Sequence, residues 1–234
     1  MKINRRQFVR NLGLGTASLS MGSLISTSSC APSGDSRDKR GKVSDDDQFL
    51  FIGDDIAIAQ TEYGKVQGYL LNHVYTFLGV PYGADTSGKN RFMPPQKPEP
   101  WTDVRPAVFY GNTAPQRMEN RWPNNYGTFA DHWNYWDVSE DCLYLNVWTP
   151  GIADGKRRPV LVWLHGGGFT NGSGIEQDGY HGENISREGD IVFCSINHRL
   201  GPIGFSDLSG VGGEAYKDSG NVGMLLSLIH ISEP

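Results

Sequence analysis

The chain has 234 residues, of which 38% are hydrophobic and 20% are charged, with 21 Lys and Arg against 26 Asp and Glu. This mildly acidic, globular composition excludes a basic module that binds nucleic-acid backbones, so we expect no nucleic-acid partner. No uninterrupted apolar run reaches the length that a membrane-spanning helix needs.

Residues 1–30 are expected to be an export signal. Arg5 and Arg6 precede Phe8 and Arg10, and a weakly apolar stretch rich in Gly and Ser follows them. This pattern resembles a twin-arginine signal, which predicts the twin-arginine export machinery as a partner and export across a bacterial inner membrane. The alternative is a basic tail that has no role in export.

Cys30 follows a run of mostly small residues, 24–29. The run resembles the segment before the lipid-modified Cys of bacterial lipoproteins, although Thr27 stands where an aliphatic residue is usual. Two outcomes stay open: a lipid anchor at Cys30, or cleavage nearby that leaves a periplasmic protein. Residues 31–48 combine Pro, Ser and Gly with alternating charges and are expected to form a disordered linker.

The folded part is expected to begin at residue 49. Apolar patterning predicts three short antiparallel strands, over residues 56–61, 65–70 and 74–80. Gly64 and the pair Asn72 and His73 are natural turn sites between them. Residues 81–140 lose periodicity and are expected to form a long ordered loop, packed against the core by its tryptophans.

The rest of the pattern predicts an α/β fold with a mixed, mainly parallel central sheet. Residues 143–149 form one strand, while residues 159–164 and 190–196 are continuous apolar runs. Such runs are typical of strands buried on both faces, in a parallel sheet that helices cover. Residues 183–188 between them are expected to form a short helix.

A triglycine segment, His165-Gly166-Gly167-Gly168-Phe169, directly follows the strand at residues 159–164. Consecutive glycines adopt backbone conformations that other residues avoid, so their N–H groups can converge on one point. That geometry suits the oxyanion of an acyl-transfer intermediate. The alternative is a plain glycine-rich turn, against which the buried strand and the flanking His and Phe argue.

Other motifs accompany this segment in the order found in one known family, at residues 61–68, 77–82, 91–92, 139–147, 197–201 and 220–224. The Glu-Asp-Cys-Leu-Tyr-Leu-Asn-Val run within residues 139–147 is highly specific. Together they resemble the type-B carboxylesterases, the family that includes the cholinesterases. The resemblance covers about residues 55–225, so we assign residues 49–225 to a partial domain of this family.

The resemblance implies an α/β-hydrolase fold and hydrolysis of small-molecule carboxylic esters by a serine, a His base and an acid. This chemistry needs no cofactor and no metal. By the family pattern, Gly167 and Gly168 supply the two N–H donors of the oxyanion hole, and Arg91 pairs with Glu140 for structural reasons. Family members often link the Cys that corresponds to Cys142 to an earlier Cys by a disulfide. In this chain the position of that earlier Cys is occupied by Ala114, so no disulfide is expected.

The nucleophile, acid and base are missing from the chain. No Gly-x-Ser-x-Gly turn occurs, and the nearest candidate, Ser206, lacks the second glycine and is rejected. The fold is therefore expected to be truncated before the nucleophile elbow. Residues 226–234 are identical to a translated transposase sequencing adapter and are expected to be an artefact, the alternative being a natural helix end.

Two functions stay open. The first is the N-terminal fragment of an exported serine carboxylesterase, itself inactive; the alternative is a non-catalytic, cholinesterase-like adhesion or binding protein. A third possibility is a related lipase class that has a similar glycine loop, but the sequence of residues 139–147 argues against it.

We also expect the strand at 190–196 to be exposed at a sheet edge. A substrate wall for apolar groups is expected from four aromatic residues, Trp122, Tyr126, Trp133 and Trp136.

Overall fold

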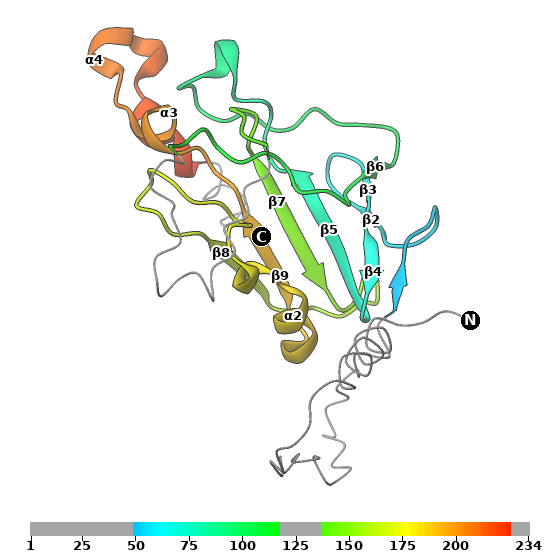
Figure 1. Ribbon diagram of the computed structural model, residues 1–234. Coiled ribbons are helices and arrows are strands. Elements are labelled where there is room, and N and C mark those ends of the chain that lie inside the picture. Colours follow the sequence, from blue (N-terminus) through cyan, green and yellow to red (C-terminus); the bar gives the residue numbers. More distant parts are fainter. Residues whose placement is uncertain (1–48, 118–136, 226–234) are drawn as a thin grey trace, which may run out of the picture. The chain divides into compact units, whose positions relative to one another are not determined.

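The structure is a computed structural model that describes residues 49–117 and 137–225 (Figure 1). The chain divides into two compact units, residues 1–41 and 42–234, and every described residue belongs to the second. The expected export signal, Cys30, the linker and the tail at 226–234 lie outside the described residues. Among the helices that are described, none has the length and apolar character to cross a membrane.

The described chain is built around a six-stranded sheet with the order β1-β4-β5-β7-β9-β8, which Figure 1 shows. Its strands are β1 (Leu50–Phe51), β4 (Tyr69–Leu71), β5 (Val74–Pro81), β7 (Tyr144–Thr149), β8 (Val160–Leu164) and β9 (Val192–Ile196). Strands β8 and β9 pair in parallel, and the other neighbours pair antiparallel.

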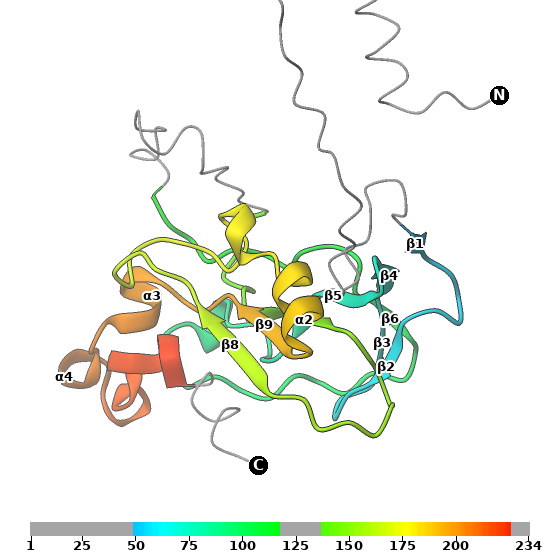
Figure 2. The same cartoon turned by 90° about the horizontal axis from the view of Figure 1, so that it is seen from below.

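The predicted α/β class and mixed sheet are confirmed, but the described strands are mainly antiparallel, not mainly parallel. A parallel pair needs a crossover connection, usually through a helix. Helix α2 (Glu183–Gly189) lies between β8 and β9 in sequence and beside β9 in space (Figure 2). The earlier strands of this sheet are joined by a hairpin and by loops, so they pair antiparallel.

A second, three-stranded sheet consists of β2 (Ile58–Gln60), β3 (Lys65–Gln67) and β6 (Arg105–Pro106). The single strand predicted at residues 65–70 is thus two strands in two sheets, separated by Gly68. A side chain at Gly68 would collide with the carbonyl oxygen of Thr76, so glycine permits the close approach. The Gly68 N–H donates to the Ala57 carbonyl at 2.9 Å, which holds the crossing point.

The two predicted turns are confirmed. Asn72 and His73 have φ values of 50° and 66° and form the two-residue hairpin loop between β4 and β5. Positive φ at both positions is the signature of the type I′ turn, which matches the twist of the paired strands. At the other turn, the Thr61 hydroxyl accepts the N–H groups of Tyr63 and Gly64, each at 3.2 Å.

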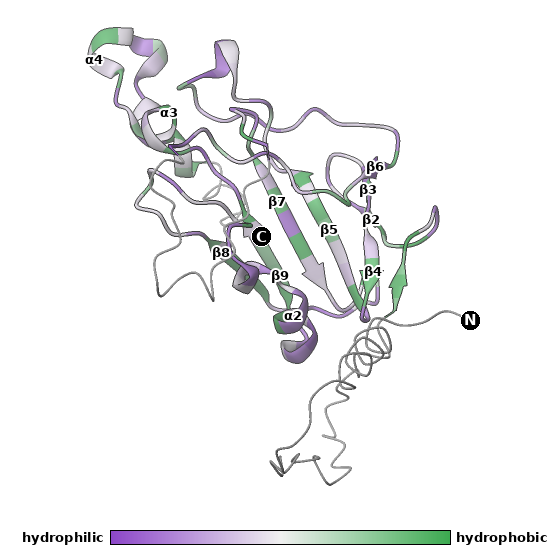
Figure 3. Cartoon of the chain, in the orientation of Figure 1, coloured by the Kyte–Doolittle hydropathy of each residue, from purple (hydrophilic) through white to green (hydrophobic). Residues whose placement is uncertain are grey.

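Each face of the large sheet has its own apolar layer. Figure 3 colours the hydrophobic residues of the strands green. Trp148 and Phe193 lie on the face that α2 covers, where the Ser186 hydroxyl donates to the Trp148 carbonyl at 3.0 Å. On the opposite face, Phe77 packs with Val66 of the small sheet. The core therefore holds β5, β7 and β9 between α2 and the small sheet.

The two continuous apolar strands differ in burial, which corrects two expectations. Strand β9 lies between β7 and β8, and its residues Phe193 to Ile196 are buried, so it is not an exposed edge. Strand β8 ends the strand order, and Val160 and Leu164 are 63% and 42% exposed, so it is not buried on both faces. Both strands are apolar enough to favour burial, but the strand order of the sheet determines that β9 is buried and β8 is partly exposed.

Short helices follow β9 and complete the described chain. They are α3 (Gly201–Phe205), α4 (Ser209–Gly212) and the 3₁₀ turns η4 (Glu214–Tyr216) and η5 (Ser219–Asn221). Two more 3₁₀ turns, η2 (Gly88–Asn90) and η3 (Asp178–Tyr180), lie in the connecting loops. In the long loop after β5, Trp101 is half-buried and donates its indole N–H to the Lys65 carbonyl at 2.8 Å, so it packs as expected.

Candidate active site

The triglycine loop, residues 165–169, begins at the carboxyl end of β8 (Figure 1). Ligands of open α/β sheets bind outside the carboxyl ends of the parallel strands. His165 is 8% exposed, whereas Gly166, Gly167, Gly168 and Phe169 are exposed. The loop therefore has a buried beginning and presents its glycines at the surface.

Gly167 is a position that only glycine fits. Its φ is 118°, and an added Cβ would collide with the carbonyl oxygen of Asn171. The Gly167 carbonyl accepts the N–H groups of Thr170 and Asn171 at 3.2 and 3.3 Å and the Thr170 hydroxyl at 2.9 Å. The turn therefore uses the carbonyl of Gly167 as its hydrogen-bond acceptor.

Gly168 differs from Gly167 in the space around it. Its φ is 61°, in the left-handed region, and no atom lies within 4 Å of an added Cβ. Among the hydrogen bonds between described residues, none uses the N–H of Gly167 or of Gly168. The two residues that the sequence predicts as oxyanion donors thus have N–H groups available for a ligand.

A cavity of about 380 Å³ lies against this loop. Its lining includes Gly168 and Phe169 of the loop, together with His198, Leu200 and Met224 from the segments after β9. The cavity is therefore built from the loop that bears the free N–H groups and from two other motifs that the sequence singled out.

Gln116 ties the far side of the loop to the rest of the domain. Its side-chain N–H donates to the Gly172 carbonyl at 2.9 Å, and its side-chain oxygen accepts the Gly172 N–H at 2.8 Å. A Cβ at Gly172 would collide with the Gly166 carbonyl and the His165 ring. This anchor was missed from sequence, although Gln116 lies only two residues after Ala114.

Asn197, directly after β9, is buried and forms hydrogen bonds with three other segments. Its side-chain oxygen accepts the Gly174 N–H at 2.7 Å, and its side-chain N–H donates to the Asn112 carbonyl at 3.0 Å. Its own carbonyl accepts the Tyr82 hydroxyl at 2.6 Å. These bonds join three connecting segments at the carboxyl end of β9, so the asparagine of the motif at 197–201 has a structural reason.

Two histidines stack beside the loop. The rings of His165 and His198 lie 4.6 Å apart with an interplanar angle of 6°. Burial, followed by the neighbouring His165, lowers the pKa of His198 to about 4. The Nδ1 atoms of His165 and His198 lie 2.8 and 2.9 Å from the carbonyl oxygens of Gly166 and Arg199. With a pKa of about 4, His198 is uncharged at neutral pH, and a neutral imidazole can still donate Nδ1–H to the Arg199 carbonyl.

Arg91 and Glu140 are brought together as an ion pair, with Nη2–Oε1 at 2.6 Å and Nε–Oε2 at 2.8 Å. This two-point geometry fixes the guanidinium against the carboxylate. The Glu140 carbonyl also accepts the Thr86 hydroxyl. Because the Arg91 side chain is 47% exposed, water weakens the attraction, and the pair connects the η2 segment to the start of the strand β7 region.

Neither described cysteine has the properties of a nucleophile. Burial raises the pKa of Cys142 and of Cys194 to about 12, so both thiols are protonated at neutral pH. Cys142 lies in a buried cluster with Ala114 and Leu200. Ala114, at the position where the resemblance would place a second cysteine, is thus part of the packing around Cys142.

Arg199 is buried without a carboxylate partner among the described residues. Its Nη1 donates to the Met93 carbonyl at 2.9 Å and its Nη2 to the Val222 carbonyl at 2.7 Å. Burial lowers its pKa from the usual value. The side chain therefore joins two distant segments of backbone on the side of β9 where the cavity lies.

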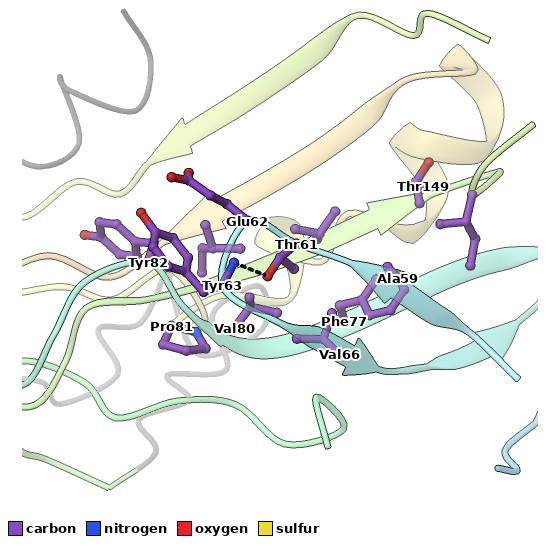
Figure 4. Close-up of a pocket in the computed structure, with 13 residues that line it drawn as sticks. Ala59, Thr61, Glu62, Tyr63, Val66, Phe77, Val80, Pro81, Tyr82 and Thr149 are labelled. Atoms are coloured by element: carbon purple, nitrogen blue, oxygen red, sulfur yellow. Dashed lines mark hydrogen bonds between the residues drawn. The ribbon is translucent and has the colours of Figure 1, made fainter. Parts of the chain in front are cut away.

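A strongly apolar pocket lies elsewhere, between the small sheet and the face of β5 and β7 (Figure 4). Its volume is about 370 Å³, and Val66, Phe77 and Leu145 are among its lining residues. It shares no lining residue with the cavity at the triglycine loop, and no His, Ser or Cys is among its described lining residues. The candidate chemistry therefore belongs to the loop.

The remaining candidates do not add to this site. Ser206, rejected from sequence, ends helix α3 with its N–H bonded to the Pro202 carbonyl at 3.2 Å. Trp122, Tyr126, Trp133 and Trp136 lie outside the described residues. Within residues 49–117 and 137–225, no group of three or more His, Cys, Asp or Glu side chains could hold a metal ion.

Comparison with known proteins identifies related sequences. The profile of the carboxylesterase family matches residues 55–226. Phenmedipham hydrolase of Pseudarthrobacter oxydans is 45% identical over 157 residues, which cover 67% of this chain and 30% of that protein. Para-nitrobenzyl esterase of Bacillus subtilis is 40% identical over 171 residues, covering 72% of this chain and 32% of that protein.

Solved structures agree with this similarity. A Clostridium hathewayi esterase, reported to hydrolyse aliphatic aromatic polyesters, gives a TM-score of 0.70 at 36% identity, over 79% of this chain and 35% of that one. The Geobacillus stearothermophilus carboxylesterase EST55 gives 0.64 at 36% identity, over 75% and 33%. The chain therefore spans about a third of the length of these relatives.

Proposed function

Because the chain belongs to the carboxylesterase family, we propose that the full-length protein is an exported serine carboxylesterase. It hydrolyses small carboxylic esters through an acyl-enzyme and uses no metal or cofactor. The observation that supports this most directly is the pair of unused N–H groups at Gly167 and Gly168, beside a cavity at the carboxyl end of β8. A binding protein would have no need of two such donors.

The proposed mechanism assigns a defined task to these two amides. When a serine hydroxyl attacks the ester carbonyl, the carbonyl oxygen becomes negatively charged in a tetrahedral intermediate. The N–H groups of Gly167 and Gly168 donate to that oxygen, and one such donor is typically worth about 2.7–4 kcal/mol of transition-state stabilisation. Because both donors are backbone amides, they do not titrate and are held in place before substrate binds.

The serine, the acid and the His base are assigned to the part of its relatives that this chain does not span. No Gly-x-Ser-x-Gly turn is present in the 234 residues. In α/β-hydrolases the acid and the His follow the serine along the chain. His165 and His198 therefore have no part in proton transfer, in agreement with the lowered pKa of His198.

Aromatic esters are the proposed substrate class to test first. One relative is named para-nitrobenzyl esterase, and a structural neighbour is described as acting on aliphatic aromatic polyesters.

We further propose that residues 1–30 direct export by the twin-arginine route, with Cys30 either lipidated or removed. Fusion of residues 1–48 to a reporter, with Arg5 and Arg6 both changed to Lys as control, tests the route.

The decisive experiment uses the intact gene and its protein product with residues 1–30 removed. We expect turnover of p-nitrophenyl butyrate and covalent labelling of one serine by a fluorophosphonate probe, with the labelled serine in a Gly-x-Ser-x-Gly turn. Absence of both turnover and labelling would overturn the esterase proposal. A gene that lacks the serine would instead support the alternative, a cholinesterase-like adhesion or binding protein.

A further inference from the structure

The triglycine loop is held at both ends by aromatic rings that come from outside it. His165, before the glycines, stacks on His198, with ring centroids 4.6 Å apart and nearly parallel planes. Phe169, after the glycines, packs on Phe205 at 4.9 Å with an interplanar angle of 53°. We call these four residues the ring clamp.

The two outer rings of the clamp belong to one short segment. His198 follows β9, and Phe205 ends helix α3, seven residues later. Their rings lie 6.4 Å apart at 88°, an edge-to-face arrangement within the range in which aromatic rings attract. The segment 198–205 therefore places one ring against each end of the loop, and the three glycines between those ends stay exposed.

A backbone hydrogen bond strengthens the second contact. The Gly201 N–H donates to the Phe169 carbonyl at 2.7 Å. Phe169 has a φ of 64°, which is unfavourable for a residue with a bulky side chain. Such a conformation persists only where the surroundings determine it. Here the Phe205 ring and the Gly201 N–H are the surroundings that fix Phe169, and with it the peptide of Gly168.

The Phe205 ring packs closely against the backbone of Gly223. A Cβ at Gly223 would collide with the Phe205 ring and crowd the Arg199 carbonyl. The glycine of the motif at 220–224 thus leaves room for this ring. Arg199 binds the Val222 carbonyl at 2.7 Å, which keeps that motif close to the segment 198–205. The support passes from residue 223 through Phe205 to the end of the triglycine loop.

We propose that His198 and Phe205 are positioning residues that set the direction of the Gly167 and Gly168 N–H groups. This inference rests on the proposed esterase function for its effect on rate, but its structural part does not. Neither side chain donates to the oxyanion. Each acts through a ring contact on His165 or Phe169, so loss of a ring loosens the loop and misplaces the amides.

The test compares side chains of similar volume with and without a ring. In the full-length protein, His198→Leu and Phe205→Leu remove a ring, whereas His198→Phe keeps a flat ring at the first contact. His181→Leu is the matched control, because His181 packs its ring on Trp148 at 5.0 Å, near the start of β9. The control removes a similar ring pair at the opposite end of that strand.

We expect His198→Leu and Phe205→Leu to lower kcat for p-nitrophenyl butyrate about tenfold or more, because displacing reacting groups by 1 Å can cost about 100-fold. KM should change less than about twofold, since the donors act mainly in the transition state. Binding of a trifluoromethyl ketone should weaken by the same factor as kcat. His198→Phe should recover most of the rate, and His181→Leu should leave kcat unchanged.

Amide hydrogen exchange of residues 165–172 gives a second measurement that does not depend on catalysis. The hydrogen-bonded amides of Thr170, Asn171 and Gly172 report on the loop, and their exchange should be faster in both Leu variants than in the wild type. It should stay at the wild-type rate in His198→Phe and His181→Leu. Unchanged exchange and kcat in a folded Phe205→Leu protein would overturn the ring clamp, even if His198→Leu failed to fold. If the wild type hydrolyses no ester, the proposed function fails, and exchange alone decides the inference.

Discussion

The centre of the large sheet and the triglycine loop are held in different ways. At the centre, Trp148 is 1% exposed and packs against Phe193 and His181, so burial of apolar surface stabilises it. The exposed part of the loop, Gly166 to Phe169, buries little. Its shape depends on positive φ values, on the hydrogen bond from the Gly201 N–H to the Phe169 carbonyl, and on the contact of the Phe169 and Phe205 rings.

This difference separates stability from activity. Substitutions at the sheet centre should lower the free energy of unfolding and leave the chemistry of the folded molecules intact. Substitutions in the loop should lower the rate far more than the stability, because few packed side chains depend on it. Substitutions in the full-length protein test whether changes in stability and changes in reaction rate are in fact separate.

The largest effect is expected for Trp148→Ala. Removing a fully buried Trp typically costs about 3–5 kcal/mol of unfolding free energy. The indole N–H has no hydrogen-bond partner among the described residues, so the loss is one of packing. Urea denaturation measures it, and kcat per active site, counted by fluorophosphonate titration, should stay within about twofold of wild type. A large fall in kcat per site would break the separation.

Gly167→Ala should have the opposite signature. The new methyl group collides with the Asn171 carbonyl, so the turn must open and the Gly167 N–H must move. Losing one oxyanion donor lowers kcat by about 10²–10³-fold, equivalent to about 2.7–4 kcal/mol. Steady-state kinetics should show this fall in a protein whose Tm is reduced only slightly. A normal kcat would remove Gly167 from the proposed oxyanion hole.

Lowering the pH tests His198, which follows β9 of the sheet and stacks on His165 of the loop. The pKa of His198 is about 4 when folded, against an ordinary value near 6.5, so the unfolded chain binds the proton more tightly. Stability should therefore be full above pH 6.5 and fall as the pH drops towards 4, by about 3 kcal/mol at 1.36 kcal/mol per pKa unit. His198→Phe, which cannot titrate, should flatten this part of the pH profile in urea denaturation.

Gly168→Ala is expected to be milder than Gly167→Ala. No atom opposes the new methyl group, so the change adds only the strain of a left-handed φ, about 1–2 kcal/mol. We expect about a tenfold loss in kcat, with KM nearly unchanged. Equal losses at Gly167 and Gly168 would mean that φ strain, rather than the collision with Asn171, determines the response of the loop.

Sequence patterns predicted most of the elements and the position of the loop. Apolar runs located β5, β7 and β9, and the Asn72 and His73 pair located the hairpin, because local patterns govern these features. The split at Gly68 and the exposure of β8 were not predicted, since both depend on which segments meet in space. For the same reason, the motif at 197–201 contained His198 without revealing what its side chain contacts, and the sequence did not single out the contacts of Gln116 and Phe205.

The smallest effect is expected for Glu140→Gln. This change removes the charge that faces Arg91 but keeps the size of the side chain and one oxygen acceptor. Water reaches the guanidinium, so the pair resembles an exposed ion pair, and such pairs contribute little and are screened by salt. Tm should fall slightly at low ionic strength and match the wild type at 1 M NaCl, with kcat unchanged at both. A salt-independent loss of kcat would show that the pair acts on the loop, and the separation between structural and catalytic regions would then fail at residues 139–142, just before β7.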